Sequence, residues 1–161
     1  MDLNTFTANI CNMRVYIDTS VVGGYYDKEF EDATIRLFKK VENGVITLVI
    51  SNLMEAELLR APAHVRNHLD KYHQKHIERV ALTKEATELA DQYIAEKVVG
   101  MTSRADCQHI AIATLNKVDI LVSWNFKHIV NLTRIRGYNS VNLKHGHIML
   151  EIRTPKEITE E

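Results

Sequence analysis

The chain has 161 residues, of which 45% are hydrophobic and 25% charged, and its formal net charge is −1. These values are typical of one globular domain with its own core, and they exclude collagen-like and disordered chains. Two cysteines, Cys11 and Cys107, are too few for a disulfide framework. No apolar run approaches the ~20 residues of a membrane span, and no secretory signal opens the sequence. We therefore expect a cytoplasmic protein that makes no membrane contact.

Strand and helix patterns alternate through the first half of the chain. Residues 1–12 show no period and are predicted to be a tail, and the β-branched run at 14–18 predicts a buried strand that opens onto a loop at Gly23-Gly24. Apolar side chains three and four apart predict a helix at 31–42. Further patterns predict a strand at 45–50, a helix capped by Ser51 that reaches residue 60, and a helix from Pro62 to residue 76.

The same alternation continues in the second half. A marginal strand at 77–82 precedes a helix that Thr83 caps and that runs through residue 98 on a clear apolar stripe. Ser103 is predicted to cap a helix that reaches residue 116, and a strand follows at 120–123. The last part is predicted to hold a short helix at 127–136, an edge strand at 148–152 and a C-terminal tail at 156–161.

Alternating strands and helices predict an α/β fold in one domain at residues 13–155. We expect a central, mainly parallel sheet of four or five strands, with helices on both faces joined by right-handed crossovers. In such a sheet, ligands gather beyond the carboxyl ends of the strands, near the point where the strand order reverses. The polar residues that follow strands are therefore the candidates for a functional site.

Three acidic residues are candidate metal ligands. Asp18 follows the first strand, and Asp106 lies in the first turn of a later helix. Glu57 lies on the inward side of the helix after the second strand, whereas Glu55, two residues earlier, points away. Each has an ordinary alternative role: a turn-forming Asp, a partner of the helix dipole and a surface carboxylate, respectively. Taken singly, none of them predicts a function.

Five further polar residues accompany these acids. The hydroxyls of Thr19, Ser20 and Ser123 are candidates to orient a phosphate or a water molecule. His109 is a candidate substrate contact, although a helix histidine is more often simply packed. Asn125 follows the fourth strand and is a candidate catalytic residue, with a turn-forming Asn as its ordinary alternative.

The order of these residues is more informative than any one of them. The sequence resembles the PIN-domain family, and more narrowly its bacterial VapC-like toxins from toxin–antitoxin pairs. This resemblance covers most of residues 13–155 and depends on four segments, which are Asp18-Thr19-Ser20, Glu57-Leu58, Asp106 with His109-Ile110-Ala111, and Ser123-Trp124-Asn125.

That resemblance implies a three-layer PIN-like fold and a divalent metal, Mg²⁺ or Mn²⁺, held by Asp18, Glu57 and Asp106. The fourth acid that is usual in the family is replaced by Asn125, which keeps an oxygen ligand but removes one negative charge, so the number of ions stays open. The resemblance also implies an RNA substrate, a homodimer and a cognate antitoxin that inserts into the acidic groove.

The residue types fit this chemistry independently of the family. Hard divalent ions prefer oxygen ligands, and clustered carboxylates have raised pKa values until a cation offsets their charge. A divalent ion can polarise a phosphoryl oxygen and activate water for attack on phosphorus. We therefore expect a metal-dependent endoribonuclease, a hydrolase of RNA phosphodiester bonds that leaves a 5′-phosphate, with Asp18, Glu57, Asp106 and Asn125 in its catalytic site.

Two other functions are open. A PIN-like fold without catalysis would be an RNA-binding or protein-interaction module, with Asn125 marking the loss of the site. A phosphatase with an aspartyl nucleophile is disfavoured, because its second acid would stand at Ser20. The basic segment at 60–79 is either a solvated helix face or a phosphate-binding patch, and Trp124 and Phe126 are either core aromatics or base contacts.

Overall fold

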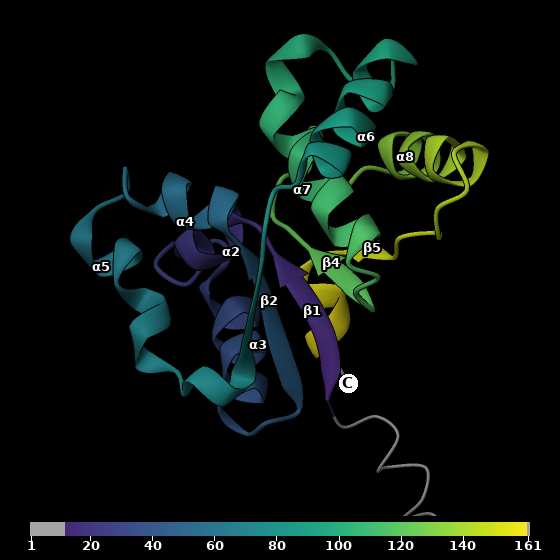
Figure 1. Cartoon of the computed structure of the whole chain (residues 1–161). Coiled ribbons are helices and arrows are strands. Elements are labelled where there is room, and N and C mark those ends of the chain that lie inside the picture. Colours follow the sequence, from purple (N-terminus) through teal and green to yellow (C-terminus); the bar gives the residue numbers. More distant parts are fainter. Residues whose placement is uncertain (1–11, 161) are drawn as a thin grey trace, which may run out of the picture.

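A computed structural model describes residues 12–160. Most of the predicted N-terminal tail, residues 1–11, lies outside the described residues. Five strands form one sheet in the order β3-β2-β1-β4-β5, and every neighbouring pair is parallel (Figure 1). The strands are β1 (Met13–Ile17), β2 (Ile46–Ser51), β3 (Ile77–Val80), β4 (Ile120–Val122) and β5 (Ile152–Arg153).

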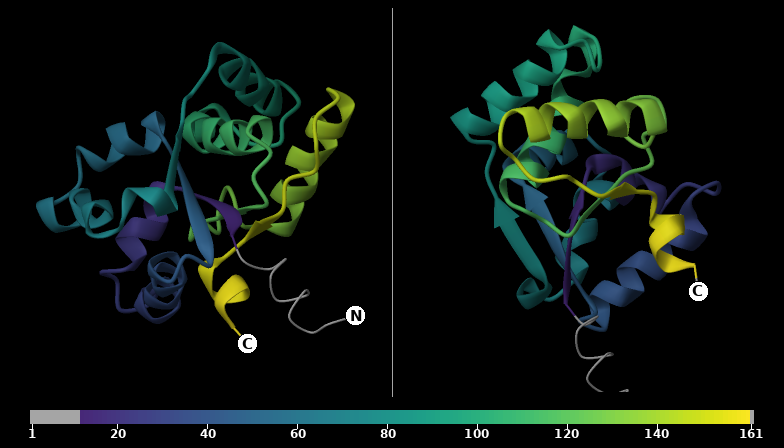
Figure 2. Two further views of the ribbon diagram at one scale, coloured as in Figure 1. Left: turned by 60° about the horizontal axis from the view of Figure 1, so that its bottom comes forward. Right: turned by 90° about the vertical axis from the view of Figure 1, so that its right-hand side faces the viewer.

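Helices cover both faces of this sheet, as expected for the three-layer fold (Figures 1 and 2). Successive strand side chains point to opposite faces, so Tyr16 packs in one core while Val15 and Ile17 pack in the other. The core with Tyr16 is completed by α6 (Lys84–Ala95), α7 (Arg104–Leu115) and α8 (Leu132–Lys144). The opposite core is completed by α2 (Thr19–Gly24), α3 (Glu31–Glu42) and α4 (Asn52–Leu58).

Several elements form where their local signals predict them. The helix predicted at 31–42 is α3, which buries Leu37, Phe38 and Val41 against the sheet. The side chain of Ser51 accepts the amide N–H of Met54 at 3.2 Å and so caps α4. Thr83 caps α6 in the same way. These predictions are confirmed because each depends on side chains within one or two turns.

Three local predictions between residues 23 and 103 were wrong. The predicted loop at Gly23-Gly24 is the second turn of α2. The helix predicted from Pro62 to residue 76 is broken into α5 (Ala63–Arg66), η1 (His68–Lys71) and η2 (Gln74–His76). This segment buries few side chains, and without a continuous apolar stripe a long helix has nothing to pack against. Ser103 is the last residue of a short turn, η3 (Met101–Ser103), and stands at the N-cap position of α7, but its side chain makes no capping hydrogen bond.

The C-terminal part also differs from the prediction. The helix expected at 127–136 begins later, as α8, because the side chain of Asn131 accepts the amide N–H groups of Thr133 and Arg134. The edge strand predicted at 148–152 is wrong in its bounds: β5 lies at the edge of the sheet, as expected, but shares only Ile152 with the predicted range. The predicted tail at 156–161 contains the helix α9 (Pro155–Thr159), which a capping box between Thr154 and Glu157 starts and which packs beside α3 (Figure 2). Among residues 12–160, no helix has the length and apolar character needed to cross a membrane.

Candidate active site

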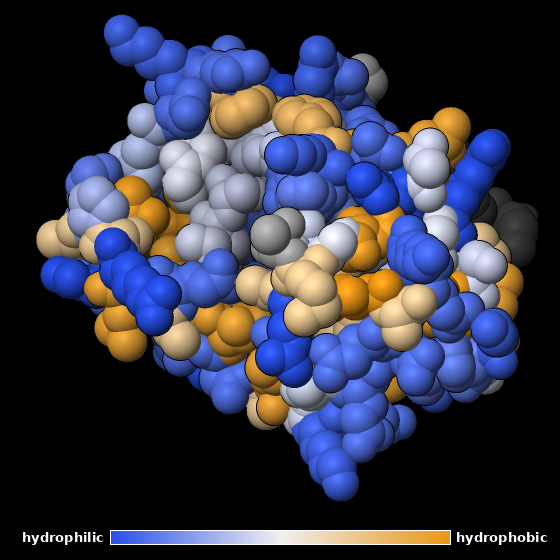
Figure 3. Space-filling model, turned by 90° about the horizontal axis from the view of Figure 1, so that it is seen from above, coloured by the Kyte–Doolittle hydropathy of each residue, from blue (hydrophilic) through white to orange (hydrophobic). Residues whose placement is uncertain are grey.

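The candidate site lies where the strand order reverses. From β1 the chain builds the sheet outward through β2 and β3, then returns to place β4 on the other side of β1. Asp18 follows β1 directly and Ser123 follows β4, so the two residues leave neighbouring strands at the same end of the sheet. Figure 3 looks onto this end and shows hydrophilic side chains interspersed with separate apolar groups. This is the position at which open α/β sheets bind their ligands.

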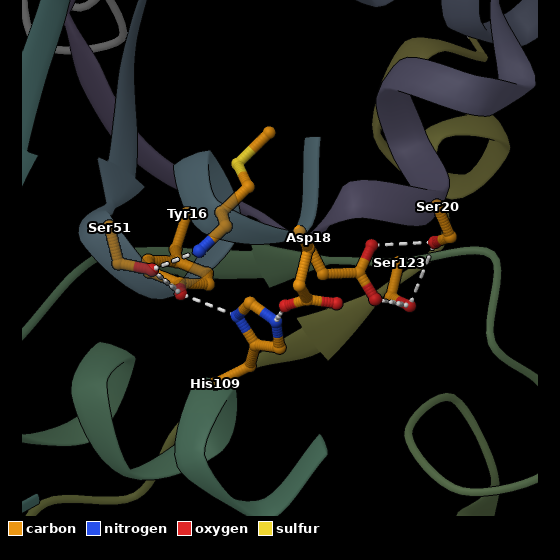
Figure 4. A network of polar contacts seen from close by, with 8 residues as sticks. Tyr16, Asp18, Ser20, Ser51, His109 and Ser123 are labelled. Carbon is orange, nitrogen blue, oxygen red and sulfur yellow. Dashed lines mark hydrogen bonds and ion pairs between the residues drawn. The ribbon is translucent and has the colours of Figure 1, made fainter. Parts of the chain in front are cut away.

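Two serine hydroxyls hold the Asp18 carboxylate. Ser20 Oγ donates to Asp18 Oδ1 at 2.5 Å, and Ser123 Oγ donates to Oδ2 at 2.6 Å (Figure 4). Each hydroxyl oxygen in turn accepts a backbone N–H, Ser20 from Trp124 at 2.9 Å and Ser123 from Asn125 at 2.9 Å. Because those N–H groups occupy one side of each hydroxyl oxygen, the hydroxyl protons are directed at the carboxylate. The orientation of Asp18 is therefore determined by the turn that follows β4.

The Asp18 carboxylate is nearly inaccessible, with 5% of the residue exposed. Burial raises its pKa, because the charged form loses its hydration. The nearby His109 imidazole and the two serine hydrogen bonds lower that pKa, and the charge of Glu57 raises it again. The net shift is upward, so the site favours a positive charge beside Asp18.

A second chain of hydrogen bonds lies beside Asp18 and ends at Glu57. The Tyr16 hydroxyl contacts Ser51 Oγ at 2.8 Å and His109 Nδ1 at 2.6 Å (Figure 4). On the other side of the imidazole, His109 Nε2 lies 2.5 Å from Glu57 Oε1. Burial raises the pKa of the Tyr16 hydroxyl, which therefore stays protonated and can donate to His109 Nδ1. A neutral His109 then has its proton on Nε2, which donates to the Glu57 carboxylate.

This chain changes the interpretation of two predicted residues. Glu57 lies on the inward side of α4, as expected, whereas Glu55 points away and pairs with Arg79 at 3.1 Å. His109 is only 2% exposed, so it lies beneath the site and holds Glu57, and it offers little surface for the substrate contact that we expected. Tyr16 and Ser51 were not predicted to take part. A buried tyrosine needs a partner for its hydroxyl, and this rule was the available signal for Tyr16.

Asp106 completes the predicted acidic group. It lies one turn before His109 in α7 and is partly buried. Burial raises its pKa first, the charge of Asp18 raises it further, and His128 and His109 lower it. The carboxylates of Asp18, Glu57 and Asp106 thus come from three separate elements and act on one another electrostatically, although they are far apart in the sequence.

Thr19 and Asn125 have different surroundings. The Thr19 hydroxyl oxygen is buried and has no hydrogen-bond partner among the residues that the structure describes. Asn125 Oδ1 accepts the amide N–H of His128 at 3.0 Å, and its backbone carbonyl accepts the amides of Ile129 and Val130. Asn125 therefore has the turn-forming role that was its ordinary alternative, and its role as a metal ligand stays a prediction.

The carboxylate oxygens of Asp18, Glu57 and Asp106 are the type of ligand that a divalent cation prefers, but the three carboxylates do not surround a common point. Between residues 12 and 160, no group of three or more His, Cys, Asp or Glu side chains is arranged so that it could hold a metal ion. Glu57 is bound to His109, and the neighbouring carboxylates raise the pKa of Asp106, as like charges do. The predicted metal ligands stay a prediction.

Comparison with known proteins connects this arrangement to a fold. No protein-family model matches the sequence, and no curated protein is similar to it. One similar structure is VapBC2 from Rickettsia felis, which was solved bound to a DNA fragment from its promoter. It is 16% identical with a TM-score of 0.57, and the match covers 88% of this chain and 98% of that chain. VapC20 from Mycobacterium tuberculosis, a Sarcin-Ricin loop cleaving toxin, is 12% identical with a TM-score of 0.54, over 85% of this chain and 98% of that one. The fold of this chain is PIN-like.

The likeness is one of fold. A tyrosyl-tRNA synthetase from Aeropyrum pernix also matches, with 13% identity and a TM-score of 0.52 over 93% of this chain and 54% of that chain. Because one fold supports many activities, similarity at these identities establishes the arrangement of helices and strands, and the chemistry has to be argued from the residues of the site.

Proposed function

We propose that this protein is a metal-dependent endoribonuclease of the PIN type, which hydrolyses RNA phosphodiester bonds to leave a 5′-phosphate and serves as the toxin of a toxin–antitoxin pair. The observation that carries the proposal is the electrostatic coupling of Asp18, Glu57 and Asp106 near the switch point of a parallel sheet, where burial raises the pKa of Asp18 and Asp106. The fold similarity to a toxin described as Sarcin-Ricin loop cleaving supports it.

The residues of the site would divide the work as follows. Asp18, Glu57 and Asp106 would supply oxygen ligands to Mg²⁺ or Mn²⁺, and the ion would offset the charge that burial disfavours. When bound, such an ion polarises a phosphoryl oxygen and activates water. The Thr19 hydroxyl is buried and has no partner among the described residues. The proposal gives it a water molecule or a phosphate oxygen that enters the site as its partner.

The other polar groups would hold the ligands in place. Ser20 and Ser123 keep both oxygens of Asp18 in one orientation, and His109 keeps Glu57 directed at the site. Holding ligands in this way limits the reorganisation that the reaction requires. The RNA substrate, a homodimer and a cognate antitoxin belong to the same proposal.

One observation favours a second candidate, a non-catalytic RNA-binding or protein-interaction module. In the described part of the chain the acidic side chains do not surround a common point, and Asn125 uses its side-chain oxygen to form a turn. A protein of this kind would bind RNA or a partner protein and leave RNA uncut.

Cleavage by matched variants separates the two candidates. We expect Asp18→Asn and Glu57→Gln to lower Mn²⁺-dependent cleavage of an RNA panel by about 100-fold or more, because several kcal/mol of transition-state stabilisation depend on the ligands. Glu55→Gln is the control, since Glu55 stands on the same helix, points outward and pairs with Arg79. Mn²⁺ should also raise the melting temperature of the wild type more than that of Asp18→Asn. Unchanged cleavage by Asp18→Asn would reject the site, and RNA binding with neither cleavage nor a Mn²⁺ effect would favour the non-catalytic module.

A further inference from the structure

Outside the acidic site, three exposed side chains form a compact group, which we call the Tyr26 shelf: Tyr26, His64 and Lys71. The rings of Tyr26 and His64 meet edge to face, with centroids 4.8 Å apart. Lys71 Nζ donates to the Tyr26 hydroxyl at 3.0 Å and lies 5.5 Å from the centre of that ring. Tyr26 is 37% exposed, so the shelf presents aromatic surface and a positive charge together.

A buried histidine holds the shelf from below. His68 is 0% exposed, and its Nδ1 lies 2.8 Å from the Tyr26 hydroxyl while its Nε2 lies 3.0 Å from the Tyr72 hydroxyl. The Lys71 ammonium group can only donate a hydrogen bond, so the Tyr26 hydroxyl oxygen accepts from it. The Tyr26 hydroxyl proton is then directed at His68 Nδ1, which accepts it. His68 Nε2 then donates to Tyr72. The shelf is thus ordered before any ligand arrives, which lowers the entropy cost of binding.

The charge of the shelf and of the chain segment at 60–71 that supplies His64 and Lys71 suits a polyanion. Lys71, Arg66 and Arg60 are exposed, and none of them forms an ion pair within residues 12–160. Asp70 and Asp27 are the acidic neighbours in sequence and offset part of this charge. The whole chain has a net charge of −1, so a nucleic acid has to be bound by a local group of cations. Binding of phosphates to such cations releases counterions, which favours the complex.

The shelf is also connected to the acidic site. Helix α2 begins directly after Asp18 and has 6 residues, and Tyr26 follows two positions after its end. At about 1.5 Å per residue, a helix of this length separates the two features by roughly 9 Å along its axis. In addition, α2 packs beside α4, which carries Glu57 and leads into α5. The shelf and the carboxylates are therefore joined by one short helix and by the neighbouring α4.

We propose that the Tyr26 shelf is a contact site for single-stranded RNA, with a base stacked on the exposed Tyr26 ring and held at its edge by His64, whose ring stands at 81° to that of Tyr26, and with a phosphate at Lys71. The inference rests on the proposed function in that RNA is the substrate. Aromatic rings beside a cation are the usual platform for unpaired bases, since every base has a face that can stack. The bases of duplex RNA are already stacked on one another, so a duplex could use only the charge.

RNA binding without metal tests the site directly. The wild type and variants would be titrated, in EDTA so that no cleavage occurs, against a fluorescent single-stranded oligoribonucleotide at several salt concentrations. We expect Lys71→Gln to weaken binding and to reduce the slope of log K against log salt by about 0.7, the value for one phosphate contact to a single strand. Tyr26→Leu should weaken binding by roughly five-fold or more and leave that slope unchanged, because it removes stacking and no charge.

The control variants separate the shelf from general effects. Lys84→Gln makes the same change on α6, on the opposite face of the sheet, and should alter neither affinity nor slope. His64→Ala removes a ring that is exposed, so it tests the contact with the base even where Tyr26→Leu fails to fold. An unchanged slope for Lys71→Gln, equal competition by duplex RNA, or no binding of single-stranded RNA by the wild type would each overturn the proposal.

Cleavage measured on the same variants with Mn²⁺ distinguishes this proposal from the nuclease proposal. If the shelf variants lose RNA affinity and the wild type cuts no RNA, the binding site stands and the nuclease proposal fails. If the wild type cuts RNA and the shelf variants bind as tightly as it does, the reverse holds.

Discussion

At the scale of single residues, Asp18 carries the main electrostatic cost of the site. Its pKa in the folded chain is raised above the unfolded value of 3.8, chiefly by burial. A carboxyl group of this kind stabilises the fold when protonated, so its contribution declines as pH rises from 3.8 through the folded pKa. Without a cation, the ionised Asp18 lowers stability near neutral pH, and a bound cation would recover it. The two serine hydrogen bonds offset only part of this cost.

Asn125 stands where the resemblance to PIN domains predicts a fourth acidic residue, and a variant at this position tests whether it contributes to an ion site. In Asn125→Asp, a carboxylate oxygen can still accept the His128 amide, so the turn should form, and one negative charge is added beside the other acids. We expect the variant to show a larger rise in melting temperature with Mn²⁺ than the wild type, with half-saturation at several-fold lower Mn²⁺, because affinity for hard cations grows with ligand charge. Thermal unfolding over a Mn²⁺ titration measures both. Identical titrations for the two proteins would place residue 125 outside any ion site.

At the scale of elements, α2 shows how a short helix positions the site. The Gly23-Gly24 pair predicted a loop, but Gly24 is buried and its missing side chain leaves room for the Trp124 ring. Trp124 in turn donates its backbone N–H to Ser20, whose hydroxyl holds Asp18. Close packing between α2 and the turn after β4 is thus linked to the orientation of the Asp18 carboxylate.

The two glycines of α2 make a matched pair of variants. A Cβ at position 24 would lie 2.6 Å from Trp124 Nε1 and 2.9 Å from Thr34 Oγ1, whereas a Cβ at position 23 would meet nothing within 4 Å. We expect Gly24→Ala to lower the free energy of unfolding by roughly 1–3 kcal/mol through overpacking. Gly23→Ala should be neutral or stabilising by up to about 1 kcal/mol, because Ala favours helix more than Gly does. Urea denaturation measures both values, and equal effects at the two positions would refute the packing role of Gly24.

At the scale of the whole molecule, His68 couples stability to pH. Burial, and to a smaller extent the charge of Lys71, lower its pKa from 6.5 to about 4. The unfolded chain therefore binds a proton first as pH falls, so the stability that neutral His68 contributes is complete above pH 6.5 and is lost between 6.5 and about 4. The full loss corresponds to roughly 3 kcal/mol at about 1.4 kcal/mol per pKa unit.

Urea denaturation from pH 7.5 to pH 4 tests this coupling. We expect the wild type to lose stability across the window more steeply than His68→Gln, whose amide cannot titrate. The exposed His73→Gln is the matched control and should follow the wild type. The difference between wild type and His68→Gln isolates this residue from Asp18 and Asp106, whose raised pKa values change stability with pH in the opposite direction. Parallel curves for wild type and His68→Gln would contradict the assignment.

The sequence by itself determined much of the fold, because the relevant signals are local. Alternating apolar runs predicted the strands, spacings of three and four predicted α3 and α6, and side chains one turn away predicted the caps of α4 and α6. The same local geometry predicted that Glu57 faces inward and Glu55 outward. Local signals failed for the segment from α5 to η2, where packing against distant elements decides whether a long helix forms. For α9 the local signals, Pro155 and the capping box of Thr154 and Glu157, are present in the sequence but were not used.

Only the tertiary structure decided which groups meet in the site. The hydrogen bond from Ser123 to Asp18 spans 105 positions of the chain, and that from Tyr16 to His109 spans 93. No periodicity in the sequence reports such a contact, because it depends on which strands become neighbours and on how far each turn extends beyond the sheet. For the same reason the sequence could propose Asp18, Glu57 and Asp106 as partners, while the distance between their oxygens is decided by His109, the serines and the packing of α2.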